Sequence, residues 1–87
     1  MPNTLIESMY YKLAIIGTRI PGIQYFIRHK QNGLLINNNN ENDLIKNLNL
    51  LINNKKIRII LGSNAQKTII KKGNKKHFQE AWIKILK

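Results

Sequence analysis

Two short apolar segments, Leu13 to Ile16 and Leu34 to Ile36, alternate with helical patterns along this chain. A short apolar run closed by turn residues is typical of a buried strand, and its alternation with helices predicts an α/β layer with parallel strands. Parallel strands need cover on both faces and neighbours at their edges, so two of them are too few for an independent sheet. We therefore expect parallel strands near residues 13–17 and 33–36, in a chain that looks like the end of something larger.

Apolar residues at helical spacing predict helices around these strands. The first is expected from Thr4 to Tyr11, with Thr4 and Glu7 fitting a capping box, and a single turn from Gly22 to Ile27. Three longer helices are expected near the end of the chain, and we interpret the tryptophan of the last one as a core residue. Their apolar positions are Leu44, Ile45, Leu48, Leu51 and Ile52, then Ile57, Ile60, Leu61, Ala65 and Ile69, then Phe78, Ala81, Trp82, Ile85 and Leu86.

The chain is strongly basic, with a formal charge of +11 over 87 residues. Binding to nucleic acid is the first interpretation of such a balance. Lysine outnumbers arginine by 12 to 3, however, whereas base readout and bidentate phosphate binding favour arginine. We therefore interpret most of the lysines as solvated and expect no nucleic-acid partner. An anionic membrane leaflet is a second surface that such a charge would suit.

Composition also bears on metal and membrane sites. The chain has no cysteine, which excludes disulfides and thiolate metal sites. His29 and His77 lie far apart without metal-ligand spacing, and we expect both to face solvent. No apolar run approaches the length of about 20 residues that a membrane span needs. We assign no metal and no cofactor.

Four segments carry motifs that occur together, at matching spacing, in one enzyme family. Residues 2–9 resemble P-x-x-x-x-E-A-M, residues 18–22 resemble T-x-x-P-G, residues 32–36 resemble N-G-L-L-V, and residues 61–65 resemble L-G-x-N-A. With the strand expected between the first two, these segments are similar to those of group 1 (family 4) glycosyltransferases, which have the GT-B fold.

The resemblance implies that residues 1–87 form a partial group 1 glycosyltransferase C-terminal domain, the domain that binds the nucleotide sugar. Its fold would be a partial Rossmann-like C-terminal domain of the GT-B fold, with two short parallel strands, flanking helices and a helical C-terminus. The first glutamate of the family's pair would fall before Met1, and the acceptor-binding domain has no counterpart here. We therefore expect a truncated enzyme.

The resemblance also implies a binding site for the donor nucleotide sugar. A helix N-terminus offers unpaired N–H groups and a partial positive charge to a diphosphate, and a carboxylate such as Glu7 can accept bonds from two ribose hydroxyls. The alternatives are that Glu7 only completes a capping box and that Thr18 belongs to an ordinary connection. No catalytic residue is assigned. The donor-binding residues implied are Asn3, Thr4, Leu5, Glu7, Thr18 and Gly22.

Four residues depart from the family pattern. Lys12 and Lys30 stand where glycine is usual, Ala14 where proline is usual, and Tyr25 in place of a common glutamate. These departures leave open a remnant without activity, and the charge leaves open a basic nucleic-acid-binding module.

By resemblance, the activity is retaining transfer of a hexosyl or other glycosyl group from a nucleoside-diphosphate sugar in the synthesis of cell-surface polysaccharide or glycolipid. We expect the isolated chain to be inactive. The implied partner is the nucleoside-diphosphate sugar. An N-terminal half supplied as a separate chain and an anionic membrane surface are further alternatives. The expected location is the cytoplasm, with the inner face of the membrane as the alternative.

Overall fold

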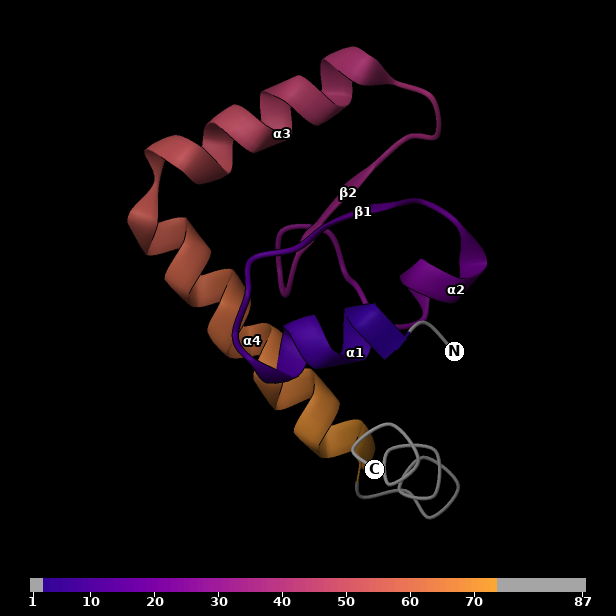
Figure 1. The fold of residues 1–87 in the computed structure, drawn as a ribbon, viewed down its shortest axis with the longest axis vertical. Coiled ribbons are helices and arrows are strands. Elements are labelled where there is room, and N and C mark those ends of the chain that lie inside the picture. The colour runs from indigo at the N-terminus through magenta and orange to yellow at the C-terminus, as the bar shows by residue number, and fades with distance from the viewer. Residues whose placement is uncertain (1–2, 74–87) are drawn as a thin grey trace.

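The computed structural model describes residues 3–73 as a two-stranded sheet with helices packed around it (Figure 1). The α/β class and most of the expected elements are confirmed. The last expected helix, with Trp82, and also His77 lie outside the described residues. The elements are α1 (Asn3–Tyr10), β1 (Ile16–Thr18), α2 (Pro21–Gln24), β2 (Leu34–Ile36), α3 (Glu41–Asn53) and α4 (Lys55–Gly73).

The two strands pair in parallel, as predicted, with Ile16 beside Leu34 and Thr18 beside Ile36. This arrangement is compatible with part of a Rossmann-like domain. The first strand begins later than its apolar run predicted, at Ile16 rather than Leu13. Thr18, expected in the following loop, is consequently the last residue of β1.

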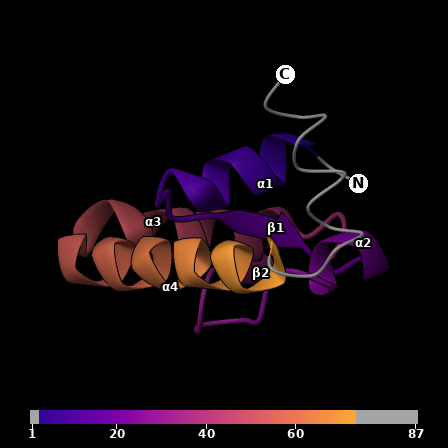
Figure 2. The ribbon, with the colours of Figure 1, turned by 90° about the horizontal axis from the view of Figure 1, so that it is seen from below.

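Both faces of the strand pair are covered. Alternate residues of a strand point to opposite faces, so the neighbours Leu34 and Leu35 enter different clusters. Leu35 packs with apolar residues of α1 and α4, and Leu34 packs with Leu51 of α3 and with Leu61 of α4. Figure 2 shows α1 lying over one side of the strands. Cover on both faces is what a parallel pair requires.

Helix α3 covers the sheet with only a small part of its apolar pattern. Leu51 is buried, whereas the other four apolar positions of the predicted stripe are exposed. The second buried residue of α3 is Asn47, whose Nδ2 donates to the carbonyl oxygen of Asp43 at 2.7 Å. On α4 the predicted stripe is buried or half-buried except at Ile60, which is 55% exposed.

The C-terminus of α1 ends in a Schellman motif. The backbone N–H of Leu13 donates to the carbonyl oxygen of Ser8 at 3.0 Å, and that of Lys12 donates to Met9 at 3.2 Å. Lys12 has a φ of 62°, a left-handed conformation that glycine adopts readily. Because Leu13 takes part in this cap, strand β1 cannot begin there.

The N-terminus of α1 differs from the expected capping box. The helix begins at Asn3, so Thr4 lies inside it and is not the N-cap residue. The hydroxyl of Ser8 donates to the carbonyl oxygen of Thr4 at 2.7 Å, which is a bond of the helix interior. Glu7 is therefore not explained as the partner of a Thr4 cap.

The turn before β2 is organised by Asn32, which is buried. Its Nδ2 donates to the carbonyl oxygen of Phe26 and to the Oγ1 of Thr68, both at 3.0 Å. Its Oδ1 accepts the backbone N–H of Arg28 at 2.7 Å. Lys30, in the same turn, has a φ of 66°. The asparagine of the N-G-L-L-I segment therefore has a structural role.

His29 does not face solvent as predicted. It is half-buried, and its Nδ1 accepts the backbone N–H of Leu35 at 2.9 Å. Burial lowers the pKa of His29 below its ordinary 6.5, and the positive charges of Arg19 and Lys30 act in the same direction, while Asp43 opposes them. The folded chain favours the neutral form of the His29 side chain, because a protonated Nδ1 cannot accept this bond.

We predict that Lys12→Gly and Lys30→Gly each stabilise the chain by about 0.5–1 kcal/mol. A left-handed backbone costs a residue with a side chain about 1–2 kcal/mol, and glycine avoids this cost. The larger conformational entropy of glycine in the unfolded chain offsets part of the gain. Urea unfolding measures the difference. Lys46→Gly, at an exposed position inside α3, is the control and should destabilise by about 1 kcal/mol. If Lys12→Gly and Lys30→Gly both destabilise the chain, the left-handed backbone conformation at these two residues is contradicted.

We also predict that acid weakens the fold through His29. Its pKa is lowered on folding, so the unfolded chain binds the proton more tightly. The contribution of His29 to the free energy of unfolding is therefore fully present above pH 6.5. It is lost as the pH falls from there through the lowered pKa of the folded state. Urea unfolding between pH 7 and 5 should show a decline that is smaller in His29→Asn, whose Oδ1 can accept the bond without titrating. Parallel declines in both proteins would exclude His29 as the source.

Candidate functional site

Helix α1 separates its residues into a buried and an exposed face. Leu5, Ile6 and Met9 are buried, whereas the side chains of Thr4 and Glu7 are exposed. The buried face explains the methionine of the motif as a packing residue. Leu5 can meet a ligand only through its backbone, while the carboxylate of Glu7 is accessible from solvent.

Thr18 and Gly22 lie on either side of the short connection that leads from β1 into α2. Thr18 is half-buried, and its carbonyl oxygen accepts the N–H of Ile20 at 2.8 Å. Gly22 is exposed in the first turn of α2, after Pro21. This connection starts at the carboxyl end of a parallel strand, where ligands bind in open α/β sheets.

Gly22 differs from the other motif glycines in having open space around it. Apart from its chain neighbours and the backbone of its own helix, no heavy atom of the described residues lies within 4 Å of a Cβ built at Gly22. A Cβ at Gly33 would lie 2.9 Å from the Cγ2 of Ile27, and one at Gly62 would overlap the carbonyl oxygen of Lys12. Packing among the described residues thus requires Gly33 and Gly62 but does not explain Gly22.

The elements that carry the expected donor residues lie at one end of the layer. In both Figure 1 and Figure 2, α2 and the N-terminal end of α1 are on the same side of the molecule, at the end toward which β1 runs. Three cavities among the described residues, of about 550, 710 and 520 Å³, are lined by other residues. The expected donor residues are therefore grouped because they lie at the same end of the layer, and not because they line one of these cavities.

The L-G-x-N-A segment holds α4 against the residues that precede both strands. Gly62 lies against Lys12, just before β1, and the Nδ2 of Asn64 donates to the carbonyl oxygen of Gln31, just before β2, at 2.8 Å. Ala65 is fully buried in the larger cluster. This segment lies at the amino ends of the strands and is a packing motif.

A basic cavity between α4 and residues 25–32 was not predicted from the sequence. It has a volume of about 550 Å³, and Arg28, Lys71 and Lys72 contribute to its lining. Arg28 lies far from the lysine pair in the sequence, and the packing of α4 brings the three cations together. The lysine pair and the arginine carry no motif that could have linked them beforehand.

Within residues 3–73 no cluster of three or more histidine, cysteine, aspartate or glutamate side chains could hold a metal ion. In the same part of the chain, no helix combines the length and apolar character needed to cross a membrane.

Comparison with known proteins connects this geometry to a family. Residues 1–68 match the family described as glycosyl transferases group 1. The chain is 33% identical over 67 residues, 76% of its length, to an uncharacterized glycosyltransferase of Haemophilus influenzae. It is 32% identical over 83 residues, 94% of its length, to the poly(ribitol-phosphate) alpha-N-acetylglucosaminyltransferase of Staphylococcus aureus.

A third relative matches along almost the whole chain. The GalNAc-alpha-(1->4)-GalNAc-alpha-(1->3)-diNAcBac-PP-undecaprenol alpha-1,4-N-acetyl-D-galactosaminyltransferase of Campylobacter jejuni is 31% identical over 87 residues. The chain spans only a small part of these relatives: 19% of the Haemophilus protein, 17% of the Staphylococcus protein and 24% of the Campylobacter protein.

We predict opposite effects on stability for two glycine substitutions. Gly62→Ala should destabilise the chain by about 1–3 kcal/mol, because the added methyl group forces α4 away from Lys12. Gly22→Ala should change the free energy of unfolding by less than about 0.5 kcal/mol, since its surroundings are open. Thermal and urea unfolding of both variants provide the measurement. Equal losses would show that Gly22 also has a packing role.

Proposed function

The chain belongs to the group 1 glycosyl transferases, and from this membership we propose that it supplies part of the donor site of a retaining GT-B glycosyltransferase. The donor is a nucleoside-diphosphate sugar. The match over residues 1–68 carries the proposal, because it includes each of the six residues assigned to the donor: Asn3, Thr4, Leu5, Glu7, Thr18 and Gly22.

The diphosphate would bind at the N-terminus of α1. The first N–H groups of a helix have no partner within it, and the helix dipole adds a partial positive charge. The backbone around Asn3, Thr4 and Leu5 offers these groups. The buried side chains of Leu5 and Ile6 support this role, since they hold the first turn against the core.

Glu7 would bind the ribose. It lies one turn into α1, and its exposed carboxylate can accept bonds from two vicinal hydroxyls at once. The absence of a Thr4 cap supports this role, because the competing structural explanation for Glu7 depends on Thr4 being the N-cap residue.

Thr18 and Gly22 would approach the nucleotide from the connection between β1 and α2. Glycine is favoured where a ligand approaches the backbone closely. The open space around Gly22 supports such an approach, since no packing contact among the described residues requires a glycine there.

The acceptor class is proposed from the relatives. One relative is named for its action on poly(ribitol-phosphate) and another for its action on an undecaprenol-linked glycan. We propose that the complete activity serves the synthesis of a cell-surface polysaccharide or glycolipid. Within the chain, the proposed residues concern only the donor.

The test is a thermal-shift and calorimetric series with UDP, GDP and the corresponding nucleosides. We expect the diphosphates to bind and raise the melting temperature and the nucleosides to have no effect. Glu7→Gln should weaken diphosphate binding about tenfold, because one acceptor oxygen is lost and the remaining one is uncharged. Glu41→Gln, an exposed glutamate in the first turn of α3, is the matched control and should bind normally.

Gly22→Ala is the second variant in this series. It should keep its stability but lose affinity for the diphosphates, because its methyl group occupies the space next to the proposed ligand. Equal weakening by Glu7→Gln and Glu41→Gln would leave only a charge effect and contradict the assignment of Glu7. Unchanged affinity in Gly22→Ala would remove that residue from the site.

A further inference from the structure

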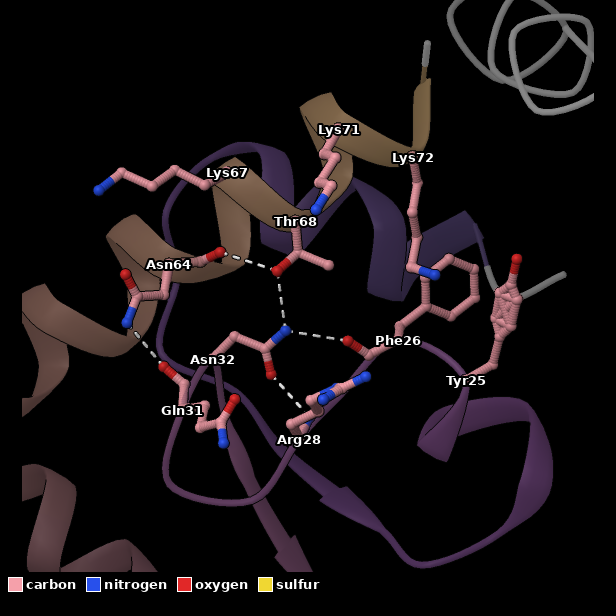
Figure 3. A pocket seen from close by; sticks show the side chains of 10 residues that line it. All are labelled: Tyr25, Phe26, Arg28, Gln31, Asn32, Asn64, Lys67, Thr68, Lys71 and Lys72. Atoms are coloured by element: carbon pink, nitrogen blue, oxygen red, sulfur yellow. Dashed lines mark hydrogen bonds between the residues drawn. The ribbon is translucent and has the colours of Figure 1, made fainter. Parts of the chain in front are cut away.

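The basic cavity beside α4 has a lining that suits an anion. Its basic residues are Arg28, Lys67, Lys71 and Lys72, and within residues 3–73 no aspartate or glutamate lines it. Figure 3 shows Lys71 and Lys72 extending from the last turns of α4 toward the segment that carries Tyr25 and Arg28, whereas Lys67 extends away from them. Two separate segments thus direct positive charge at the same space.

Aromatic contact fixes one of these cations. The Nζ of Lys72 lies 3.9 Å from the centre of the Tyr25 ring and 5.7 Å from that of Phe26. A lysine held over a ring has lost much of its rotamer freedom before any ligand arrives. The ammonium group has three N–H donors, and those that do not point at the ring remain for a further partner.

The polar groups beneath the cations are already bonded to one another. Asn32 donates to Thr68 and to the carbonyl oxygen of Phe26, and the hydroxyl of Thr68 donates to the carbonyl oxygen of Asn64 at 3.0 Å (Figure 3). These bonds make a fixed floor between α4 and the turn before β2. The charged side chains supply donors above this floor that a ligand could use.

Compensation of the helix dipole does not account for the whole cluster. Lys71 and Lys72 lie in the last turn of α4, where positive charge is favourable. Arg28 belongs to the facing segment and is not a residue of that helix. Its place in the same lining brings a third positive charge to the two lysines.

We propose that this cavity binds a phosphate-bearing anion, with the phosphate oxygens held by Lys71, Lys72 and Arg28. Phosphate suits three convergent cations, since it presents several charged oxygens to them. The volume of about 550 Å³ is in the range of pockets for small organic ligands, so the phosphate would carry an organic group. None of the six proposed donor residues lines this cavity, although Tyr25, which does, directly follows the helix that carries Gly22.

Such a phosphate can belong to a lipid headgroup or to a free metabolite, and two arms of one experiment distinguish these sources. One arm titrates the full chain with inorganic pyrophosphate, and the other uses vesicles of phosphatidylcholine with and without phosphatidylglycerol. Side-chain NMR signals of Lys71, Lys72 and Arg28 report on this cavity, which separates it from binding at α1. Response to pyrophosphate assigns a free phosphate, and response to phosphatidylglycerol alone assigns a lipid headgroup.

The variants are Lys71→Gln with Lys72→Gln, and separately Arg28→Gln. Each should weaken the binding about tenfold, as expected for lost bonds to a charged group. The matched control is Lys55→Gln with Lys56→Gln, an exposed lysine pair in the first turn of the same helix, which should keep the affinity. Arg28→Gln keeps the test valid if the α4 variant fails to fold.

Two results would overturn the proposal. The first is the absence of any response at these three side chains in both arms. The second is an equal loss of affinity in the variants and in the Lys55 and Lys56 control, which would show a diffuse electrostatic effect. Binding of a DNA duplex with such equal losses would assign the charge to nucleic-acid contact instead.

Discussion

The close approach of α4 to the segments that enter the two strands is the contact on which the rest of this structure depends. Gly62 allows the helix to lie against the carbonyl group of Lys12, where any side chain would overlap it. From there, Ala65 and Ile69 reach the cluster that includes Ile6 and Met9 of α1. A strand pair this short contributes few hydrogen bonds, so packing of α1 and α4 on it supplies most of the order. The placement of α1 and of the basic cavity follows from this packing.

The motifs of the chain divide into those that build the layer and those that the layer leaves accessible. Asn32 and Gly62 are satisfied or enclosed by their neighbours. Glu7 and Gly22 are exposed and have no such structural explanation. A motif match alone does not distinguish the structural residues from the accessible ones. Burial and hydrogen bonding make this distinction, and they support a donor role for only some of the motif residues.

Parallel pairing and the order of helices could be predicted because they follow from short-range patterns: short apolar runs, helical spacing and turn residues. The first residue of β1 could not, since the Schellman bond of Leu13 depends on the chain geometry after α1. The environment of His29 was missed for a similar reason, because its partner is a backbone N–H six residues away in the next strand. Spacing also gave no indication of which side of α3 would be covered. Four of its five predicted apolar positions remain exposed, and Asn47 is buried together with Leu51.

The bonds between α4 and the start of the chain have a consequence for synthesis on the ribosome. The Nε2 of Gln66 donates to the carbonyl oxygen of Tyr10, 56 residues earlier, and Asn64 reaches back 33 residues to Gln31. Helix α1 and both strands are therefore made well before the helix that completes their core. Until residues 61–69 leave the exit tunnel, the apolar faces of these earlier elements have no cover from α4, and a nascent chain in this state is a substrate for holding chaperones. The interval between the emergence of β2 and the emergence of residues 61–69 thus sets how long that exposure lasts.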